Sequence, residues 1–327
     1  MRLGIIGCGL IGNKRAAAAV DCGAKVASVA DLNGAAASAL AIRVGAVVLP
    51  DWRAVVDSDV DAVLVATTHN SLAEISIAAL EAGKHVLVEK PAGHNLRAVQ
   101  AILDASHRCK RVVKVGFNYR FHPAMAKAKE LVDAGALGPM MMVRARHGHG
   151  ARIGYEKEWR CRRAMSGGGE LVDQGSHLID LARWYLGDLR LKYAAVPTLF
   201  WPIEVEDNCF IALGGKDNTH AWLHASWSEW KNLFSFEIYG RTGKIMIDGM
   251  GGSYGTERLT FYKMPPQMGP PEATTWEYPG PDMSWVDEYK EFSAAIAEDR
   301  PPIGNIADAH AIWLLIDEIY RSGSSKA

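Results

Sequence analysis

The chain has 327 residues, of which 49% are hydrophobic and 22% are charged. At roughly 150 residues per domain this length suggests two domains, and it is ample to bury a sizeable core. Lysine and arginine number 36 against 37 aspartates and glutamates, which gives a net charge of −1. This balance excludes a disordered chain and a nucleic-acid-binding protein that relies on a global basic field.

The sequence indicates neither a targeting signal nor a cysteine motif for disulfides or zinc. The first apolar run meets glycine at residue 7, too early for a secretory signal, and no stretch reaches the roughly 18 apolar residues of a membrane helix. Five cysteines stand far apart without a C-x-x-C pair: Cys8, Cys22, Cys109, Cys161 and Cys209. Neither a disulfide framework nor a thiolate zinc site is expected. We therefore expect a cytoplasmic protein with no membrane or nucleic-acid partner.

The first third of the chain alternates short apolar runs with helical patterns. Strands are predicted at 2–7, 25–30, 47–49, 62–66, 85–88 and 112–116, and helices at 13–21, 35–44, 71–82 and 96–109. Gly83 supplies a stop signal after the third of these helices. This alternation is typical of βαβ units around a parallel sheet.

The remainder has longer, alternating segments. Helices are predicted at 124–134, 170–186, 284–297 and 307–321, a strand at 140–146, and several strands between 189 and 262, including 219–228 and 233–239. Residues 265–281 are rich in proline and glycine, which predicts a loop. The expected fold is an α/β N-terminal Rossmann domain plus an α+β C-terminal domain with a large, mostly antiparallel open sheet.

A glycine-rich turn follows the first predicted strand and opens the first helix. It carries Gly7, Gly9 and Gly12 in the spacing G-x-G-x-x-G. The first glycine allows the tight turn, the second lets the backbone approach a pyrophosphate, and the third permits close packing of helix on strand. In this context the pattern predicts a dinucleotide site, with the phosphates at the helix N-terminus.

Asp31 ends the second predicted strand, 19 residues after Gly12. Its carboxylate can accept hydrogen bonds from ribose hydroxyls and repels a 2′-phosphate. Leu32 and Asn33 follow, so neither arginine nor serine stands ready for that phosphate. The sequence therefore favours NAD over NADP.

Two further blocks resemble the Gfo/Idh/MocA oxidoreductases (glucose–fructose oxidoreductase, inositol dehydrogenase and relatives). One is the stretch 79–91, which ends in Glu89-Lys90-Pro91, and the other is 167–180, which reads GGGELVDQGSHLID. Together with the glycine turn they follow the order and spacing of that family. The chain departs from the family's T-P-N-x-x-H segment, because Thr68 replaces the proline and Leu72 the histidine.

The resemblance implies a set of cofactor and substrate contacts. The expected cofactor-binding residues are Gly7, Gly9, Leu10, Ile11, Gly12, Asp31, Thr67, Glu89 and Lys90. The Lys90-Pro91 bond is, by resemblance, a candidate cis peptide. Glu89 is expected to cap or turn the loop rather than to react. Expected domains are 1–121 for NAD and 122–327 for substrate binding and oligomerisation, and the closing helix 307–321 is a candidate to pack back on the first.

Hydride transfer from an alcohol requires a base close to the hydroxyl. The resemblance places Lys90 and His177 beside that hydroxyl. Our hypothesis makes His177 the proton acceptor, with the Lys90 ammonium polarising the oxygen; the reverse assignment stays open. Asp173 lies four residues before His177 on the predicted helix, and it either holds a substrate hydroxyl or orients the imidazole. Asp180 is expected to be a local structural hydrogen-bonding residue.

Other polar residues have weaker indications. Tyr119 and Arg120 end the Rossmann pattern, where they contact substrate or cofactor, or else only the domain link. Arg160 is a candidate substrate contact within an arginine-rich group, which also includes Arg144, Arg146, Arg152, Arg162 and Arg163. That group suits an anionic sugar derivative, but a solvated basic face is the favoured interpretation. His147, His149 and Cys161 form no compact ligand set, so no metal is expected.

Aromatic residues gather on a predicted strand of the second domain. Trp222, His224 and Ser226 would share one face, with Trp227 and Trp230 close by. A large apolar face of this kind is a liability unless it is covered. We expect a homodimer or homotetramer assembled through the C-terminal sheet.

The sequence therefore predicts an NAD-dependent oxidoreductase that acts on a secondary alcohol or ketone of a sugar, polyol or sugar derivative. A sugar nucleotide, sugar phosphate or uronate is within this class. Two alternatives stay open. One is a glycoside hydrolase or lyase that retains NAD and oxidises its substrate transiently, and the other is a non-catalytic NAD-sensing protein.

Overall fold

The computed structural model describes residues 1–323, and the chain divides into two compact units. Residues 1–118, 164–167 and 285–313 form the Rossmann unit. Residues 119–163, 168–284 and 314–323 form the sheet unit. The domain boundary that the sequence analysis expects between residues 121 and 122 stays a prediction.

The Rossmann unit is built on six parallel strands. They are β1 (Arg2–Ile6), β2 (Lys25–Ala30), β3 (Val47–Val48), β4 (Ala62–Val65), β5 (His85–Val88) and β6 (Val113–Val115). Their order in the sheet is β3-β2-β1-β4-β5-β6. The chain thus adds β2 and β3 on one side of β1 and β4 to β6 on the other, and the switch point lies between β1 and β4. In open α/β sheets ligands bind at such a switch point, outside the carboxyl ends of the strands. The predicted N-terminal Rossmann fold is confirmed.

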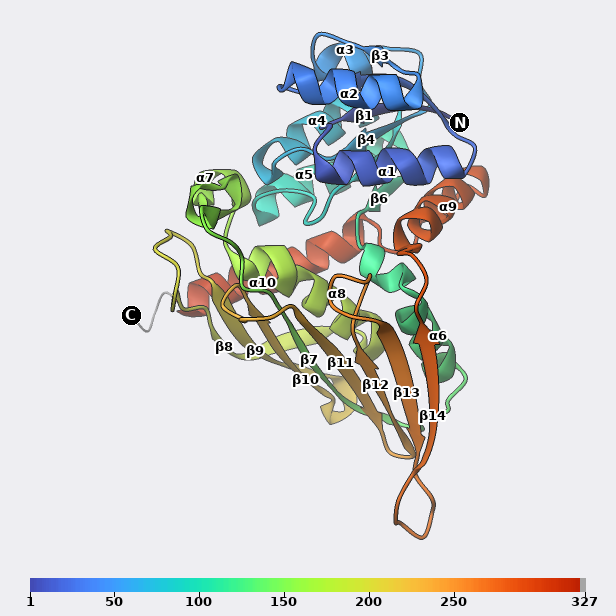
Figure 1. Ribbon diagram of the computed structural model, residues 1–327, viewed down its shortest axis with the longest axis vertical. Helices are drawn as coiled ribbons and strands as arrows, with labels where there is room; N and C mark the ends of the chain where they lie inside the picture. The colour runs from blue at the N-terminus through green and yellow to red at the C-terminus, as the bar shows by residue number, and fades with distance from the viewer. Residues whose placement is uncertain (324–327) are drawn as a thin grey trace. The chain divides into compact units, whose positions relative to one another are not determined.

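Five helices connect these strands (Figure 1). They are α1 (Leu10–Asp21), α2 (Gly34–Val44), α3 (Trp52–Val56), α4 (His69–Glu81) and α5 (Leu96–Cys109). The short α3 was not predicted; Asp51 caps it by accepting a hydrogen bond from the Ala54 N–H at 2.9 Å. Helix α1 begins at Leu10, three residues before the predicted start at Asn13, so it starts inside the glycine turn.

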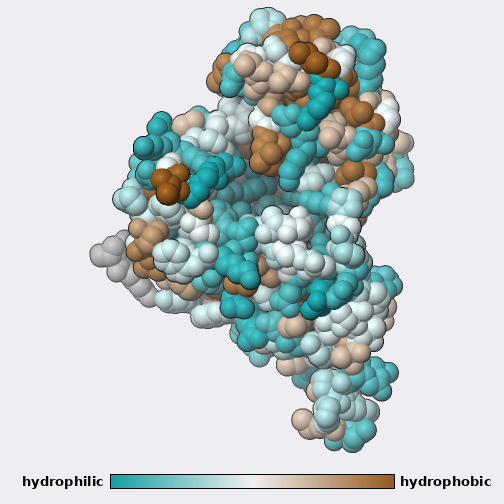
Figure 2. All heavy atoms as spheres, viewed as in Figure 1, coloured by the Kyte–Doolittle hydropathy of each residue, from teal (hydrophilic) through white to brown (hydrophobic). Residues whose placement is uncertain are grey.

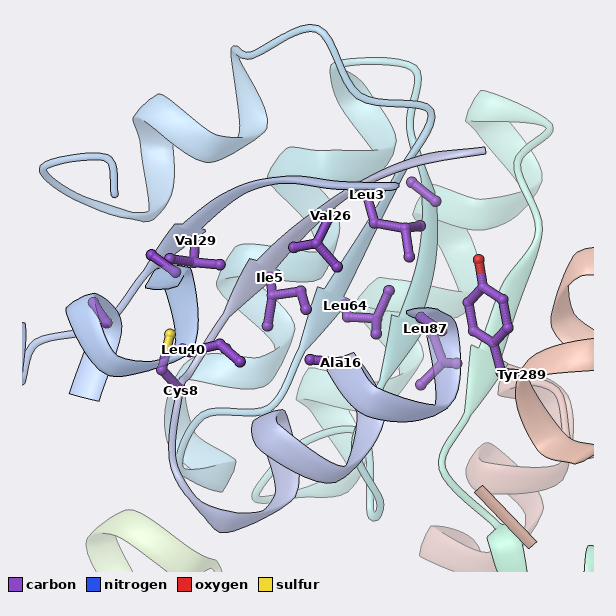
Figure 3. Close-up of a cluster of buried hydrophobic side chains, with 14 of the residues drawn as sticks. Leu3, Ile5, Cys8, Ala16, Val26, Val29, Leu40, Leu64, Leu87 and Tyr289 are labelled. Carbon is purple, nitrogen blue, oxygen red and sulfur yellow. The ribbon is translucent and has the colours of Figure 1, made fainter. Parts of the chain in front are cut away.

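The core of the Rossmann unit lies between the sheet and α1, α2 and α9 (Ser284–Ala297) (Figure 3). Its buried side chains include Leu3, Ile5, Val26, Val29, Leu40, Leu64 and Leu87. Tyr289 and Phe292 of α9 join this cluster. Each large apolar side chain buried in this way contributes roughly 1.5–3 kcal/mol. A helix that begins 169 residues after the end of β6 is therefore part of the nucleotide-binding fold.

The sheet unit contains eight strands (Figure 1). They are β7 (Met140–Gly148), β8 (Leu189–Ala195), β9 (Asn208–Gly215), β10 (His220–Ser226), β11 (Leu233–Gly240), β12 (Gly243–Asp248), β13 (Glu257–Lys263) and β14 (Glu272–Tyr278). Their order is β14-β13-β12-β11-β7-β10-β9-β8. Strands β7 and β10 pair in parallel and the other neighbours are antiparallel. The predicted mostly antiparallel sheet is confirmed.

Strand β14 corrects the predicted loop at 265–281. Residues Glu272–Tyr278 pair with β13 along its whole length, and the Thr260 and Thr275 hydroxyls lie 3.1 Å apart across the pair. The β-branched and aromatic residues of this segment favour a strand, but the prolines on both sides obscured it. The loop prediction was therefore wrong for this strand.

The predicted helix 170–186 is a composite. A π-helical segment, η4 (Leu171–Gly175), precedes α8 (Ser176–Leu186), which packs on the sheet, as α6 (Pro123–Asp133) does. Single π turns inside helices are frequent at functional sites. Four 3₁₀ turns lie in the connections, together with the short α7 (Arg163–Ser166). They are η1 (Asn118–Phe121), η2 (Tyr155–Lys157), η3 (Trp159–Cys161) and η5 (Lys216–Asn218). Helix α10 (Ile306–Gly323) closes the described chain.

Hydrophobic residues on the face shown in Figure 2 are scattered among hydrophilic and neutral ones. Within residues 1–323, no helix combines the length and the apolar character that crossing a bilayer requires.

Candidate active site

The glycine turn after β1 has the geometry that the sequence predicted. Gly7 has a φ of 94°, and a Cβ there would collide with the Ala66 carbonyl at the end of β4. A Cβ on Gly12 would collide with the Gly7 carbonyl oxygen, whereas one on Gly9 would meet nothing within 4 Å. Gly7 and Gly12 are therefore required by the turn itself. Gly9 leaves open space beside the backbone, as a pyrophosphate site needs.

Helix α1 begins at this turn without a side-chain cap. Its first N–H groups and the positive end of the helix dipole are thus available to a phosphate. Leu10, at the first helical position, is 75% exposed, while Ile11 is partly buried. The helix start therefore combines an anion site with an exposed apolar side chain.

Asp31 holds the glycine turn through its carboxylate. Its Oδ2 accepts a hydrogen bond from the Cys8 N–H at 2.5 Å, and its Oδ1 accepts one from the Asn33 N–H at 2.7 Å. Burial, together with the Asp31 charge, raises the pKa of the Cys8 thiol to about 12. Cys8 is therefore an inert thiol, and the negative charge of Asp31 stands at the end of β2, where a ribose would lie.

The segment after β4 carries the departures from the family pattern. Leu72, in place of the usual histidine, is fully buried in α4. Thr67 accepts a hydrogen bond from the Ser71 hydroxyl at 2.8 Å. His69, which the sequence analysis did not single out, is buried with its Nδ1 at 2.8 Å from the Ser166 carbonyl oxygen. Thr67 therefore lies just beyond the carboxyl end of β4, as in the family pattern, whereas His69 binds the backbone of residue 166.

Lys90 lies in a turn whose neighbours are fixed. The Ala92 N–H donates to the Glu89 carbonyl at 2.9 Å, and the Lys90-Pro91 bond is cis, as predicted. The Trp313 indole N–H donates to the Pro91 carbonyl at 2.9 Å. The Glu89 side chain is buried and forms an ion pair with Arg15. Lys90 itself is half-buried at the carboxyl end of β5.

In the sheet unit, His177 lies on the first turn of α8 and is 3% exposed. The Tyr119 ring stacks on its imidazole, with the ring centroids 3.8 Å apart and the planes 7° from parallel. The Tyr119 hydroxyl lies 3.4 Å from both the His147 Nε2 and the Gln174 Oε1. Burial raises the Tyr119 pKa well above its ordinary value, so this phenol is protonated at neutral pH. Tyr119 therefore fixes the plane of the His177 ring.

Asp173 belongs to the π-helical segment one turn before His177. It is buried, and its Oδ2 lies 3.6 Å from the Arg160 Nε. Residues 176–182 are buried all round α8, so the polar side chains of this helix face protein as well. Asp173, Arg160, His177 and Tyr119 form one polar cluster within the sheet unit.

Arg120 and Asp180 form a separate buried pair. The Arg120 Nε and Nη2 donate to the two Asp180 carboxylate oxygens at 2.9 and 2.6 Å. The side chains are 6% and 0% exposed. This bidentate pairing supports the structural role expected of Asp180, and it accounts for Arg120 without a ligand.

The other arginines of the basic group are mostly paired on the protein. Arg144 contacts Glu237, Arg152 contacts Glu158, and Arg163 lies 3.7 Å from Glu206. His147 packs against the Tyr254 ring at 4.9 Å between centroids, and burial lowers the pKa of His149. Among residues 1–323 no cluster of histidine, cysteine or acidic side chains is arranged to hold a metal ion.

The aromatic residues of the predicted face divide between surface and core, and Trp230 is 88% exposed. Trp222 is half exposed, but His224 stacks on Phe210 with the centroids 4.3 Å apart. Trp227 is fully buried beside Tyr155, Cys161 and Val205. Trp227 therefore belongs to the core and not to an exposed face.

Three residues that support these sites escaped the sequence analysis. Arg15 and Glu288 are buried charges in the Rossmann unit, and Glu206 is a buried carboxylate in the sheet unit. The Glu206 Oε1 accepts hydrogen bonds from the Gly169 N–H at 2.8 Å, the Leu171 N–H at 3.2 Å and the Tyr320 hydroxyl at 2.6 Å. It thereby anchors the glycine run before Asp173. The sequence signal that could have indicated a buried Arg15 was its charge within the alanine-rich helix α1.

Comparison with known proteins places the chain in a family. Residues 1–117 match the "Oxidoreductase family, NAD-binding Rossmann fold" and residues 125–246 the "GFO/IDH/MocA C-terminal domain". Levoglucosan dehydrogenase of Pseudarthrobacter phenanthrenivorans is 28% identical, over 85% of this chain and 82% of that protein. Inositol 2-dehydrogenase 2 of Saccharopolyspora erythraea is 36% identical, over 57% of this chain and 54% of its own length.

A solved structure agrees over the whole chain. A levoglucosan dehydrogenase in complex with NADH has a TM-score of 0.90 at 25% identity and covers 100% of this chain and 98% of its own. Both halves of the chain thus match models of the same family. The chain belongs to the Gfo/Idh/MocA family of oxidoreductases with an NAD-binding Rossmann domain.

Proposed function

We propose that the protein is an NAD-dependent dehydrogenase that transfers a hydride between the nicotinamide and a secondary alcohol or ketone of a sugar, polyol or sugar derivative. The observation that carries the proposal is the buried Asp173–His177 segment with the Tyr119 ring stacked on His177. A buried imidazole held in one plane beside a carboxylate suits proton transfer at a hydroxyl. The levoglucosan and inositol dehydrogenases among its relatives support a polyhydroxylated substrate.

In this proposal the Rossmann unit holds the cofactor. The first turn of α1 receives the pyrophosphate at Gly9, Leu10 and Ile11, and Asp31 accepts hydrogen bonds from the adenosine ribose. Thr67 and Glu89, at the carboxyl ends of β4 and β5, border the cofactor. The nicotinamide supplies the hydride acceptor or donor. Asp31 repels a 2′-phosphate, which makes NADP the poorer cofactor.

Lys90, Asp173 and His177 are the proposed catalytic residues. His177 accepts the hydroxyl proton as the C–H bond is broken, and the Lys90 ammonium stabilises the developing alkoxide. The exchanged assignment, with Lys90 as base, is distinguished by the pH profiles of Lys90 and His177 variants.

Substrate binding in this proposal falls to Asp173, Tyr119 and Arg160. Arg160 is one-third exposed and lies beside both Asp173 and Glu158, at 3.6 and 3.8 Å. A guanidinium in this position can bind a sugar hydroxyl or a carboxylate of the substrate. Arg120 is a weaker candidate, because Asp180 already engages two of its nitrogens.

We further propose a cytoplasmic homodimer or homotetramer assembled through the C-terminal sheet. All five cysteines are free thiols, which suits a reducing compartment. Trp222 and Met141 leave large apolar side chains exposed on that sheet. A monomeric mass by light scattering at micromolar concentration would contradict the assembly.

The experiment that tests the function follows absorbance of the reduced nicotinamide with pools of sugars, polyols, uronates and sugar nucleotides. NAD and NADP are run in parallel, and each pool is also tried in the reductive direction. NADH formation with one pool supports the proposal. NAD binding without turnover in either direction would contradict it and would favour a redox-neutral hydrolase or lyase, or an NAD-sensing protein.

A further inference from the structure

A chain of four buried charges runs through the Rossmann unit. Arg15 of α1 donates from Nε to the Glu89 Oε1 and from Nη1 to the Glu288 Oε2, the latter at 2.8 Å. Glu288 of α9 also accepts a hydrogen bond from the Lys114 Nζ of β6 at 2.9 Å. The side chains of Arg15, Glu288 and Lys114 are at most 2% exposed, and that of Glu89 is 12% exposed. Two positive and two negative groups thus alternate in a water-poor interior.

Such a network is costly to bury and is no general source of stability. Removing charges from water carries a desolvation penalty that ion pairing often only balances. Apolar side chains can join such elements without charges, as Tyr289 of α9 does in one core cluster with Leu87 of β5 and Ala16 of α1 (Figure 3). The position of these charges therefore calls for a role beyond stability.

The network ends at the residue before Lys90. Glu89 is held at its backbone by the Val65 carbonyl and the Ala92 N–H, both at 2.9 Å, and at its carboxylate by Arg15. On the other side of Lys90, the Pro91 carbonyl is held by Trp313. With both neighbours fixed, the Cα position and the exit direction of Lys90 are fixed as well.

Arg15 itself lies on α1, the helix that begins at the glycine turn. Arg15 follows Gly12 by three residues, one turn into α1, whose first turn opens at Gly9. Its guanidinium also lies 5.1 Å from the Trp285 ring centroid, and its Nη2 is buried without a hydrogen-bond partner. A Cβ on Gly116 would collide with that Nη2 and would lie 3.2 Å from both Glu89 oxygens. The glycine at the end of β6 thus leaves room for the pair.

We propose that Arg15 is a positioning residue that links the nucleotide-binding turn to Lys90 by fixing Glu89. The inference rests on the catalytic role proposed for Lys90. Arginine suits this position because its planar fork reaches two carboxylates on different elements at once. A lysine keeps the charge but offers a single nitrogen, so Arg15→Lys weakens the hold on Glu89 while the net charge stays balanced.

The test compares Arg15→Lys and Glu89→Gln with Lys114→Met. The control perturbs the same network at its far end, because Lys114 pairs with Glu288 and donates to the Val115 carbonyl, whereas Arg15 forms the ion pair with Glu89. All three variants are expected to unfold at lower urea. Arg15→Lys and Glu89→Gln are expected to lower kcat roughly 10- to 100-fold with the KM for substrate changed less than about threefold, because small misplacements of a catalytic group are costly. Lys114→Met is expected to keep kcat within about twofold.

A second readout needs no substrate. The rate at which an amine-reactive acetylating reagent labels Lys90 is measured by peptide mass spectrometry, with and without NAD. In the wild type and Lys114→Met, NAD is expected to change this rate by the same factor. In Arg15→Lys and Glu89→Gln, the rate without NAD differs from the wild type and the response to NAD is reduced at least threefold.

These readouts separate the two proposals. If no substrate is found, the proposed function fails, and the labelling of Lys90 still decides the role of Arg15. If Arg15→Lys does not fold, Glu89→Gln carries the same expectation. Unchanged labelling and kcat in the variants that fold, or losses of kcat in Lys114→Met equal to theirs, would overturn the inference.

Discussion

The buried pair of Arg120 and Asp180 gives a sharp test of whether Asp180, on helix α8, has a structural role. Asp180→Asn preserves the shape of the side chain but replaces one carboxylate oxygen by an amide nitrogen. One of the hydrogen bonds at 2.6 and 2.9 Å is then lost, and the Arg120 guanidinium, 6% exposed, loses the charge that balances it. Removing one partner of a buried ion pair costs about 3–5 kcal/mol.

This cost sets the expected shift in unfolding. With a denaturant slope of about 3 kcal/mol/M in urea, the midpoint of Asp180→Asn is expected to fall by about 1–1.7 M. Far-ultraviolet circular dichroism and tryptophan fluorescence would follow the transition. The matched control is Asp188→Asn, because Asp188 also pairs with an arginine of this helix, Arg183, but is 96% exposed. No measurable change in midpoint is expected for the control.

Activity separates the structural role from a catalytic one. Folded Asp180→Asn protein is expected to retain turnover within about tenfold, since Asp180 is fully buried against Arg120. A variant with a wild-type midpoint and no turnover would refute this reasoning, because Asp180 would then act on the substrate. The double variant Arg120→Leu/Asp180→Leu is expected to recover part of the lost stability.

Three further outcomes are expected. Gly9→Ala should leave the urea midpoint unchanged, because its Cβ meets no protein atom, but should weaken NAD binding at least tenfold in calorimetry, because the Cβ fills the space left for the pyrophosphate. Gly12→Ala should lower both the midpoint and NAD affinity, because its Cβ collides with the Gly7 carbonyl. Equal effects of the two substitutions would contradict the assigned glycine roles. Asp31→Ser should raise the ratio of kcat/KM for NADP to that for NAD at least tenfold, and an unchanged ratio would exclude Asp31 from cofactor choice. Burial raises the pKa of Glu206 above its ordinary 4.5, so folding favours the protonated carboxyl. Its contribution to the free energy of unfolding is therefore complete below about pH 4.5 and is lost as the pH rises through the folded-state pKa. Glu206→Gln keeps the acceptor oxygen and should therefore gain on the wild type in urea midpoint as the pH rises above 4.5; a loss relative to the wild type at neutral pH would show that the three donors require the charge.

Local patterns in the sequence were sufficient for the elements that bind the cofactor. The turn at Gly7, Gly9 and Gly12 depends on neighbouring residues, and the structure forms it between β1 and α1, with Asp31 directly after β2. The cis Lys90-Pro91 bond came from the family resemblance. These features lie within about 25 residues of each other or belong to one short motif, so a linear pattern can indicate them.

Features that depend on distant partners were not predictable in the same way. Arg15 finds Glu89 and Glu288 at separations of 74 and 273 residues, which no local pattern encodes. Strand β14 was hidden because the prolines on either side of it suggested a loop, while its pairing with β13 decided the structure. The π turn before α8 depends on the Glu206 carboxylate, which anchors the glycine run from another segment.

The most direct test of the central claim follows the transferred hydrogen itself. Once the absorbance screen has identified a pool, its active member is prepared with deuterium at the reacting carbon and mixed with NAD. The account predicts deuterium at the nicotinamide C4 by proton NMR in the wild type, and a loss of this transfer of at least 100-fold in Lys90→Met and His177→Ala. Deuterium released to water without reduced cofactor, or transfer that survives both substitutions, would contradict it.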